Sequence, residues 1–355
     1  MTEKVQTAVV GVTGYAGAEL ARLLLHHPRL KGTPPVFAGR VDAGDAARGG
    51  IPLIEIHPQL GDNNGTGSLR LEPFSWELLA DRGVQVLFLA TPHEQSRAWV
   101  PDALAHGLRV IDLSGAWRLN EASNRAVYAF EDDASPVAAK IQAQSVYGSP
   151  ELHRAQIAGA HLVANPGCYA TSVILALRPL VAAGLVNLTH GIVADCKSGV
   201  SGAGKAPTAK THYMYAADNL SAYGVFSHRH TGEILEQTGI DGNQIVFTPH
   251  LLPIPRGILS TIYVQFRDPQ TREAIAQTYH HFFAGSPMVR LYDNALPQIQ
   301  YSVRTNYADI GFQLSADGRR AVIVSCLDNL LKGASGQAVQ NLNVMLGYGE
   351  AEGLE

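Results

Sequence analysis

The segment Asn165-Pro166-Gly167-Cys168 has the residue types of a nucleophile site. Asn165 can cap a helix with Pro166 at its first position, which places Cys168 in the first helical turn. The helix dipole lowers the pKa of a thiol there, so a thiolate becomes available to attack an electrophilic carbon. A buried structural thiol is the alternative. Cys196 and Cys326 lie in apolar runs and are interpreted as such packing residues.

A thiolate nucleophile needs an acid–base partner, and residues 227–233 offer candidates. His228 and His230 supply two imidazoles, one of which can move the proton, while Arg229 or Glu233 orients groups or substrate. Half of a metal site and a plain surface loop are the alternatives. No third metal ligand lies near the two histidines in the sequence, so we expect no metal.

Two further segments suit an anionic substrate. Within residues 197–205, Ser198, Ser201 and Lys205 combine hydroxyl, ammonium and backbone N–H groups as a phosphate nest does, although the order of a P-loop is missing. Arg118 follows a predicted strand at the sheet edge where ligands bind, and it can pair with a carboxylate. A flexible loop and a solvated arginine are the respective alternatives.

A glycine-rich turn, Gly11-Val12-Thr13-Gly14-Tyr15-Ala16-Gly17, separates the first predicted strand from the first predicted helix. Its glycines let the backbone approach a pyrophosphate, and the helix N-terminus favours the anion. The spacing is G-x-x-G-x-x-G rather than G-x-G-x-x-G, so a tight turn without ligand is the alternative. The second strand ends at Arg40, which suits the 2′-phosphate of NADP, while Asp42 keeps NAD open.

The elements that must position these residues alternate along the first part of the chain. Apolar runs predict buried strands, and amphipathic stretches between them predict helices. The expected strands are 5–11, 35–38, 84–90 and 109–113, and the expected helices are 18–27 and 96–106. Strands that alternate with helices indicate an α/β fold with a doubly wound parallel sheet.

The pattern changes after about residue 162. Longer strands are predicted at 188–197, 244–247, 259–266 and 319–325. The alternation in 259–266 favours a mixed or antiparallel sheet in a second domain. The final helix, 333–346, is expected to pack back on the first domain. We therefore divide the chain into a cofactor domain at 1–162, a catalytic and oligomerisation domain at 163–325 and a C-terminal segment at 326–355.

Composition narrows the class of protein further. The 355 residues are 46% hydrophobic and 16% charged, with a formal net charge of −4. This excludes a disordered chain and gives no electrostatic reason to expect nucleic acid or an anionic membrane. No segment reaches the roughly 18 apolar residues that span a bilayer, and three cysteines suit a reducing compartment. We expect a cytoplasmic protein.

Together these segments resemble the N-acetyl-gamma-glutamyl-phosphate reductase family, the NADP-dependent enzymes of arginine biosynthesis. The resemblance covers nearly the whole chain in order. Its most specific parts are Pro166-Gly167-Cys168-Tyr169 and His228-Arg229-His230. It also includes the glycine-rich turn, Pro92-His93, Asp112-Leu113-Ser114, Arg118-Leu119, Tyr147-Gly148, Pro150-Glu151-Leu152, Ser198-Gly199, residues 201–204, Pro255-Arg256-Gly257, residues 328–330 and Lys332-Gly333.

The resemblance implies a Rossmann-type domain, an α+β domain of the glyceraldehyde-3-phosphate dehydrogenase-like C-terminal type, and a homodimer or homotetramer. It implies that a small acyl phosphate is reduced through a thioester on Cys168, with His228 favoured over His230 as acid–base group. The implied NADP-binding residues are Gly11, Thr13, Gly14, Tyr15, Ala16, Gly17, Arg40, Pro92, Ser198, Gly199 and Asn329. The implied substrate-binding residues are Arg118, Asn165, Ser201, Lys205, Arg229 and Glu233.

Some positions depart from the family pattern. Val41, residues 114–117, Lys205 and Gly232 differ from the residues typical there. The changes at 114–117 and Lys205 leave open the related reductase of lysine biosynthesis, which acts on a carrier-bound aminoadipyl phosphate. The sequence is also compatible with an aspartate-semialdehyde dehydrogenase and with a non-catalytic NADP-binding sensor.

Overall fold

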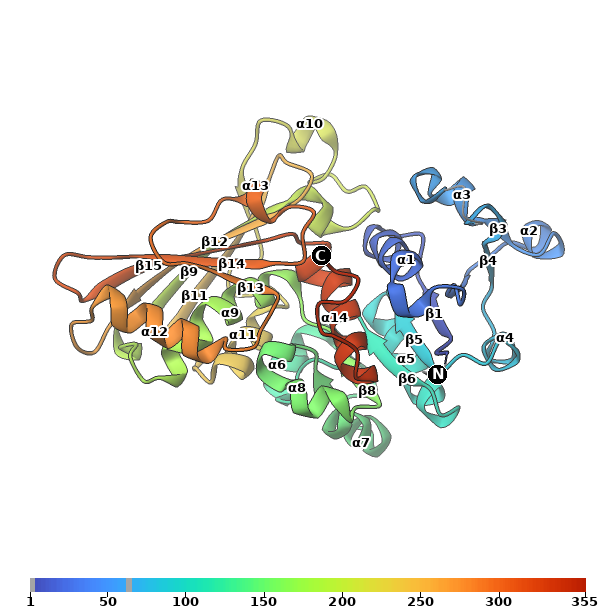
Figure 1. Ribbon diagram of the computed structural model, residues 1–355, viewed down its shortest axis with the longest axis horizontal. Coiled ribbons are helices and arrows are strands. Elements are labelled where there is room, and N and C mark those ends of the chain that lie inside the picture. The colour runs from blue at the N-terminus through green and yellow to red at the C-terminus, as the bar shows by residue number, and fades with distance from the viewer. Residues whose placement is uncertain (1–3, 62–65) are drawn as a thin grey trace.

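The computed structural model describes residues 4–61 and 66–355, and its first sheet has eight strands in the order β3-β4-β2-β1-β5-β6-β8-β7 (Figure 1). All neighbours pair in parallel except β3 and β4. The strands are β1 (Thr7–Val10), β2 (Val36–Gly39), β3 (Ile51–Pro52), β4 (Arg70–Pro73), β5 (Val86–Leu89), β6 (Arg109–Asp112), β7 (Val146–Tyr147) and β8 (Leu162–Ala164). The central order β4-β2-β1-β5-β6-β8 is that of a doubly wound dinucleotide-binding sheet, which confirms the predicted fold class.

Helices cover both faces of this sheet because its strands are apolar on both sides. Val9 and Phe88 face one cluster, while Ala8 and Leu87 face another. The first cluster includes side chains from α1 (Tyr15–His26), α8 (Pro150–Ala158) and α14 (Gly336–Leu346). The second includes side chains from α4 (Trp76–Asp81), α5 (His93–Ala105) and α7 (Pro136–Gln144). The last helix of the chain thus packs on the first sheet.

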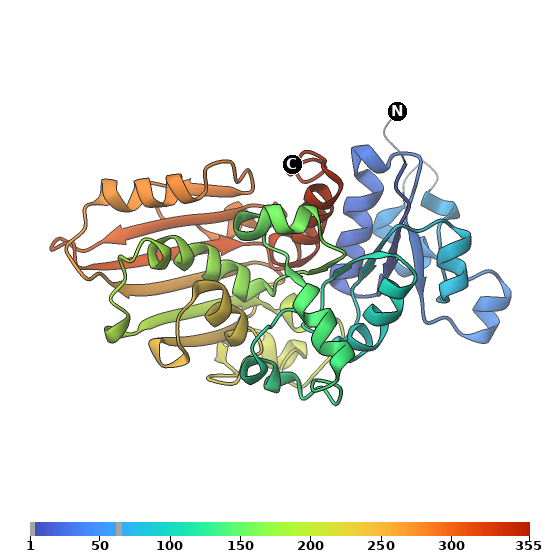
Figure 2. The same cartoon turned by 90° about the horizontal axis from the view of Figure 1, so that it is seen from below.

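The second sheet has seven strands within the described residues and is mixed, in the order β10-β11-β9-β12-β15-β14-β13. Its strands are β9 (Ile192–Gly199), β10 (Ser221–Ala222), β11 (Ile245–Leu252), β12 (Ile258–Gln265), β13 (Val289–Tyr292), β14 (Ala308–Leu314) and β15 (Arg320–Leu327). Figure 2 shows helices on one side of this sheet. They are α9 (Cys168–Ala182), α12 (Arg272–Phe282) and, beside α9, α11 (Thr231–Thr238).

The alternation predicted along β12 is confirmed. Ile262 and Val264 are buried under α9 and α12, whereas Tyr263 points to the opposite, uncovered face together with Val193 of β9. One strand prediction was wrong at its start. Residues 188–190 form a 3-10 turn instead, because Asn187 caps it and Gly191, with φ of +73°, redirects the chain into β9.

Three helix starts also differ from the sequence predictions. Helix α1 begins at Tyr15, three residues early, since the glycine-rich turn runs directly into it. Helix α5 begins at His93, also three residues early, directly after Pro92. The last helix begins at Gly336, after a π-helical turn at Leu331–Ser335. The short helices are α2 (Ala43–Ala47), α3 (Leu53–Ile56), α6 (Ala122–Arg125), α10 (Tyr213–Ala216) and α13 (Ile299–Ser302). The 3-10 turns are Pro28–Leu30, Pro58–Leu60, Thr66–Ser68, Ala126–Tyr128, Leu188–His190, Val200–Ala203 and Gly242–Gln244.

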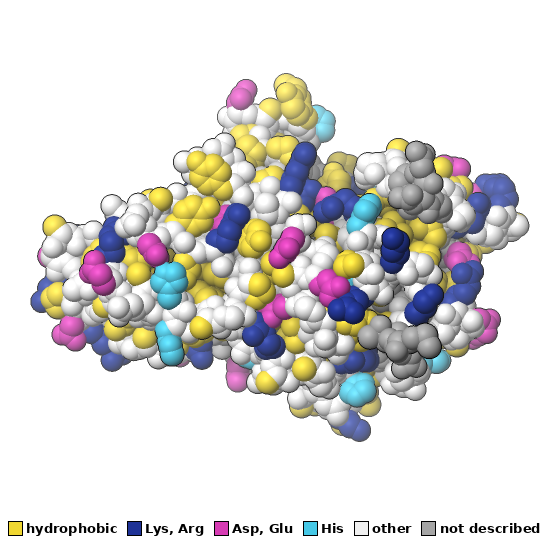
Figure 3. Space-filling view, viewed as in Figure 1, with side chains coloured by type: hydrophobic (Ala, Val, Ile, Leu, Met, Phe, Trp, Pro, Cys, Tyr) yellow, Lys and Arg dark blue, Asp and Glu magenta, His cyan; other side chains and the backbone are white. Residues whose placement is uncertain are grey.

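Helix α10 projects from the second sheet and carries apolar side chains at its end (Figures 1 and 3). Tyr213 and Met214 are 77% and 75% exposed. The segment around α10 also forms one wall of the cavity described below. In the part of the chain that the structure describes, no helix has the length and apolar character needed to cross a membrane.

Candidate active site

Cys168 is the first residue of α9, where strand β8 turns into the helix. Gly167, not Asn165, occupies the N-cap position, and no side chain caps this end. The predicted Asn165 cap is therefore wrong. Its side chain instead donates to the backbone oxygen of Ala334 (3.0 Å) and accepts from Asn341 (3.0 Å), which fixes the turn before the helix.

The thiol of Cys168 is protonated near neutral pH. Burial raises its pKa to about 11, although the backbone N–H of Tyr169 and the charge of Arg118 act in the opposite direction. The expectation of a thiol pKa lowered by the helix N-terminus is wrong for this state, because desolvation outweighs the helix. Cys196 and Cys326 are fully buried, as expected for packing residues, whereas Cys168 is partly exposed.

His228 and His230 line the same cavity as Cys168, with their ring centroids 4.7 Å apart. The ring of His230 lies against Gly167, since a Cβ on this glycine would be 2.3 Å from Nε2 of His230. The buried Nδ1 of His230 has no hydrogen-bond partner among the described residues. Burial lowers the pKa of His228 to about 3 and the pKa of His230 well below its usual value. Both imidazoles are neutral near pH 7.

These residues share a cavity of about 550 Å³ at the meeting point of the two sheets. Six residues predicted from the sequence line it: Arg118, Cys168, Ser198, His228, Arg229 and His230. Sequence reasoning gave no site role to other wall residues, among them His93, Gly115, Tyr128, Lys210, Asn219 and Tyr223. His93 and Gly115 had a usable signal, because they follow strands β5 and β6 at the sheet edge where ligands bind.

Arg229 is an exposed cation in the wall of the cavity. Its Nη1 lies 3.0 Å from Nδ1 of His93, and its guanidinium lies 5.9 Å from the ring centre of Tyr128. Arg229 is exposed, so its charge is available to an anion that enters the cavity. The His-x-His segment thus supplies a cation as well as two neutral bases.

A buried network behind the cavity fixes the turn that carries Cys168. Arg118 donates to Glu233 Oε1 (3.0 Å) and to the backbone oxygens of Asn165 and Leu113 (both 2.7 Å). Glu233 Oε2 accepts from the Tyr147 hydroxyl (2.8 Å) and from the Gly167 N–H (2.9 Å).

The side chains of Glu233 and Asn165 have no exposed surface and do not line the cavity. The prediction that these two residues touch substrate is therefore corrected to a role in shaping the turn. Three N–H groups of Arg118 already donate hydrogen bonds to protein atoms, so only its remaining N–H groups can face a ligand.

The glycine-rich turn lies where the strand order reverses between β1 and β5. Gly11 has φ of +94°, and a Cβ there would lie 2.2 Å from the backbone oxygen of Ala90. A Cβ on Gly17 would lie 2.2 Å from the oxygen of Gly11. Only glycine therefore allows α1 to start this close to the strand.

The start of α1 fits a dinucleotide. It has no side-chain cap and no acidic residue in its first turn, so the N–H groups of Tyr15, Ala16 and Gly17 are available to an anion. Arg40 directly follows β2 and is exposed, and Pro92 precedes α5 at the end of β5. Asp42 is engaged elsewhere, because its carboxylate caps α2 by accepting from the N–H of Asp45 (2.8 Å).

The predicted phosphate nest at 197–205 is divided between two places. Ser198 lines the cavity of Cys168, whereas Ser201 and Lys205 line a second cleft of about 650 Å³ beside Tyr15. Lys205 donates to the backbone oxygen of Thr13 (3.2 Å), and Asn329 donates to Ser201 (2.9 Å). The structure thus places Ser201 and Lys205 near the glycine-rich turn rather than beside Cys168.

No metal site is formed in residues 4–61 and 66–355. Within these ranges no three His, Cys, Asp or Glu side chains come together in an arrangement that could hold an ion.

The fold and the site define the class of protein. Residues 6–160 match the family model described as semialdehyde dehydrogenase, NAD binding domain, and residues 168–329 match semialdehyde dehydrogenase, dimerisation domain. Solved structures agree on the fold. Aspartate semialdehyde dehydrogenase II of Vibrio cholerae superposes with a TM-score of 0.68 at 17% identity, over 98% of this chain and 99% of that chain. The aspartate semialdehyde dehydrogenase of Candida albicans, solved with NADP, superposes with a TM-score of 0.65 at 13% identity, over 97% of this chain and 98% of that chain.

Sequence relatives narrow the class further. A protein of Desulfotalea psychrophila named N-acetyl-gamma-glutamyl-phosphate reductase is 41% identical over 99% of this chain and 98% of its own length. A protein of the same name from Methanocaldococcus jannaschii is 39% identical over 98% of this chain and 97% of its own length. The chain belongs to the N-acetyl-gamma-glutamyl-phosphate reductase family, and its expected resemblance is confirmed.

Proposed function

We propose that this chain catalyses the NADPH-dependent reduction of N-acetyl-gamma-glutamyl phosphate to N-acetylglutamate semialdehyde, with release of phosphate. The observation that carries the proposal is Cys168 at the start of α9, in one cavity with His228, His230 and the open cation Arg229. Full-length relatives that bear the name of this reductase support the choice of substrate.

The chemistry follows from the groups in the cavity. As Cys168 attacks the acyl carbon, a neutral imidazole of His228 or His230 accepts the thiol proton, because neither is protonated at neutral pH. A C–S bond forms and the bond to the phosphate oxygen breaks, which leaves a thioester on Cys168. Arg229 offsets the negative charge of the acyl phosphate. We favour His228 as the acid–base group.

The cofactor supplies a hydride, the two-electron reductant of the thioester carbon. Its phosphates are proposed to lie on the N–H groups of Tyr15, Ala16 and Gly17, with Gly11, Thr13 and Gly14 forming the turn. Pro92, Ser198, Gly199 and Asn329 are proposed as further contacts. Arg40 supports NADP over NAD, since it is exposed at the end of β2, whereas Asp42 is already committed to capping α2. As the C–S bond breaks, the histidine returns its proton to the departing sulfur.

We also propose a homodimer or homotetramer. The match of residues 168–329 to a dimerisation domain supports assembly, and so does the uncovered sheet face with Val193, Val246 and Tyr263. Light scattering tests this directly, and a monomer at micromolar concentration contradicts it. A cytoplasmic location remains our prediction from the cysteine usage.

The experiment that tests the function runs the reaction in reverse with purified protein. N-acetylglutamate semialdehyde and aspartate semialdehyde are compared, each with NADP or NAD and with or without phosphate. We expect phosphate-dependent reduction of NADP with the acetylated substrate, at a kcat/KM at least about 100-fold higher than with aspartate semialdehyde. Equal rates, or a preference for aspartate semialdehyde, would refute the substrate assignment.

A further inference from the structure

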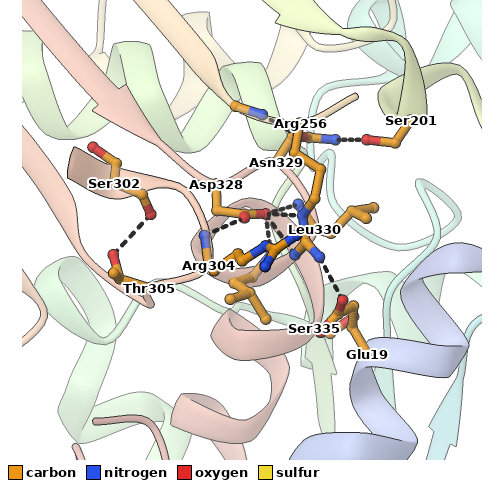
Figure 4. A network of polar contacts seen from close by, with 12 residues as sticks. Glu19, Ser201, Arg256, Ser302, Arg304, Thr305, Asp328, Asn329, Leu330 and Ser335 are labelled. Carbon is orange, nitrogen blue, oxygen red and sulfur yellow. Dashed lines mark hydrogen bonds and ion pairs between the residues drawn. The ribbon is translucent and has the colours of Figure 1, made fainter. Parts of the chain in front are cut away.

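The turn that follows β15 is held together by one buried carboxylate (Figure 4). Asp328 is 0% exposed, and it accepts from the backbone N–H groups of Leu330 (2.8 Å), Leu331 (3.1 Å) and Arg304 (2.7 Å). The turn continues as a π-helix over Leu331–Ser335, a rare conformation that is frequent at functional sites. The side chain of Asp328 therefore fixes the start of this turn through its hydrogen bonds to the backbone.

This turn contacts both segments that must meet in a reduction. The hydroxyl of Ser335 donates to the backbone oxygen of Ala16 in the glycine-rich turn (2.6 Å). Gly333 packs on the nucleophile, since a Cβ on Gly333 would lie 2.7 Å from the Cβ of Cys168. Residues 333–335 thus form a spacer of fixed length between the glycine-rich turn, where the cofactor is proposed to bind, and the thiol of Cys168.

One cation ties this spacer to α1. The guanidinium of Arg256 bonds through Nη2 to Asp328 Oδ1 (3.0 Å) and through Nη1 to Glu19 on α1. Both Arg256 and Glu19 are 17% exposed, so the bridge is largely desolvated. A buried carboxylate needs a partner, and Arg256 is the cation that pairs with Asp328 within the described residues.

We propose that Arg256 is a positioning residue that holds the glycine-rich turn at a set distance from Cys168 by bridging Glu19 and Asp328. The inference rests on the proposed function in one respect, that a dinucleotide on this turn must reach a thioester on Cys168. The planar fork of arginine serves two carboxylates at once, which lysine cannot do with the same geometry. Arg256 acts through the two carboxylates and needs no contact with substrate.

The test compares Arg256→Gln, Arg256→Lys and Glu19→Gln with a matched control, Arg290→Gln. Arg290 also bonds to a buried aspartate, Asp309, at 2.6 and 2.8 Å, but both residues belong to the second sheet. Three quantities are measured: the Kd for NADPH by fluorescence titration, the protection of Cys168 from iodoacetamide by NADP, and kcat. The first two need no substrate.

We expect Arg256→Gln and Glu19→Gln to raise the Kd at least about 5-fold, to reduce protection of Cys168 by a similar factor and to lower kcat about 10- to 100-fold. Arg256→Lys recovers part of each loss. The control variant Arg290→Gln should lower thermal stability without changing the Kd for NADPH, the protection of Cys168 or kcat. Glu19→Gln keeps the test informative if Arg256→Gln does not fold, because it leaves the bond to Asp328 intact.

Two results would overturn the inference. One is a Kd, a protection factor and a kcat in Glu19→Gln equal to those of the control. The other is full recovery of all three by Arg256→Lys. A wrong substrate assignment gives a different result. In that case neither semialdehyde is oxidised, yet NADP still protects Cys168, and Arg256→Gln still weakens that protection. If wild-type protein does not bind NADPH, both proposals fall together.

Discussion

At the scale of single residues, the site combines a protonated thiol with two neutral imidazoles. The protonation states of all three side chains have the same main cause, which is burial at the junction of the two sheets. Burial disfavours the charged form of each group, so the site holds a neutral thiol and neutral imidazoles rather than a thiolate–imidazolium pair. In the proposed mechanism the proton moves when an electrophile arrives, and the negative charge then passes from sulfur to the departing phosphate.

The contact between Gly167 and His230 gives a prediction at this scale. Gly167→Ala brings a methyl group into steric clash with the ring of His230, because the added Cβ would lie 2.3 Å from Nε2. The ring must shift, and misplacing a catalytic group by about 1 Å can cost about 100-fold in rate. We expect kcat to fall 10- to 100-fold with little change in far-ultraviolet circular dichroism. An unchanged kcat would show that His230 is not placed for catalysis.

The lowered pKa of His228 predicts a pH dependence of stability. In the unfolded chain an imidazole takes up a proton below about pH 6.5, whereas folded His228 stays neutral down to about pH 3. Its contribution to folding is therefore complete above pH 6.5 and is lost as the pH falls toward 3. Urea unfolding between pH 4 and 7 should show a shallower pH dependence in His228→Gln than in wild type. His161→Gln, at an exposed position, serves as control and should match wild type.

At the scale of elements, Arg118 and Glu233 join the first sheet to α11. The pair is nearly inaccessible to water, with side chains 7% and 0% exposed. Opposite charge from Glu233 raises the pKa of Arg118 despite burial, which keeps the guanidinium charged. Both side chains also bond to the backbone of Asn165 and Gly167, so the ion pair and the turn that carries Cys168 form one unit.

Breaking this buried pair should be costly. Glu233→Gln leaves Arg118 charged and without its counter-ion, a change that typically costs about 3–5 kcal/mol of unfolding free energy. Urea denaturation measures the loss. Asp45→Asn removes the Arg48–Asp45 pair, in which Arg48 is 70% exposed, and should cost below about 1 kcal/mol. Equal losses in the two variants would contradict the role of burial.

The elements also show how much of the fold can be predicted from the sequence. The runs at β1 and β5 and the alternation along β12 predict their strands correctly, because burial repeats with the period of the backbone. The prediction that Glu233 touches substrate rested on its place beside the two histidines in the sequence. Its actual partners, Tyr147 and Arg118, lie 86 and 115 residues away and leave no local pattern. The π-helical turn after Asp328 was missed for the same reason.

At the scale of the whole molecule, two sheets meet at one cavity. The first brings His93 and Arg118 to this cavity, and the second brings Ser198 and the histidine segment. The glycine-rich turn lies at the second cleft, beside Ser201 and Lys205. The chain then returns, so that α14 packs against α1 and α8 on the first sheet. This return carries the turn at 328–335 past both Ala16 and Cys168. The geometry of the reaction is thus a property of the assembled chain.

The central claim is that Cys168 carries the acyl group, and a single-turnover measurement tests it most directly. Wild-type protein is mixed with N-acetylglutamate semialdehyde and NADP without phosphate, NADPH is followed by absorbance, and the quenched protein is digested for mass spectrometry. The account predicts a burst of NADPH equal to the enzyme, an N-acetylglutamyl group on the peptide that contains Cys168, and turnover only after phosphate is added. Cys168→Ala should give no burst and lose at least about 10⁴-fold in kcat. A burst in Cys168→Ala, or an acyl group on any other residue, would contradict the account.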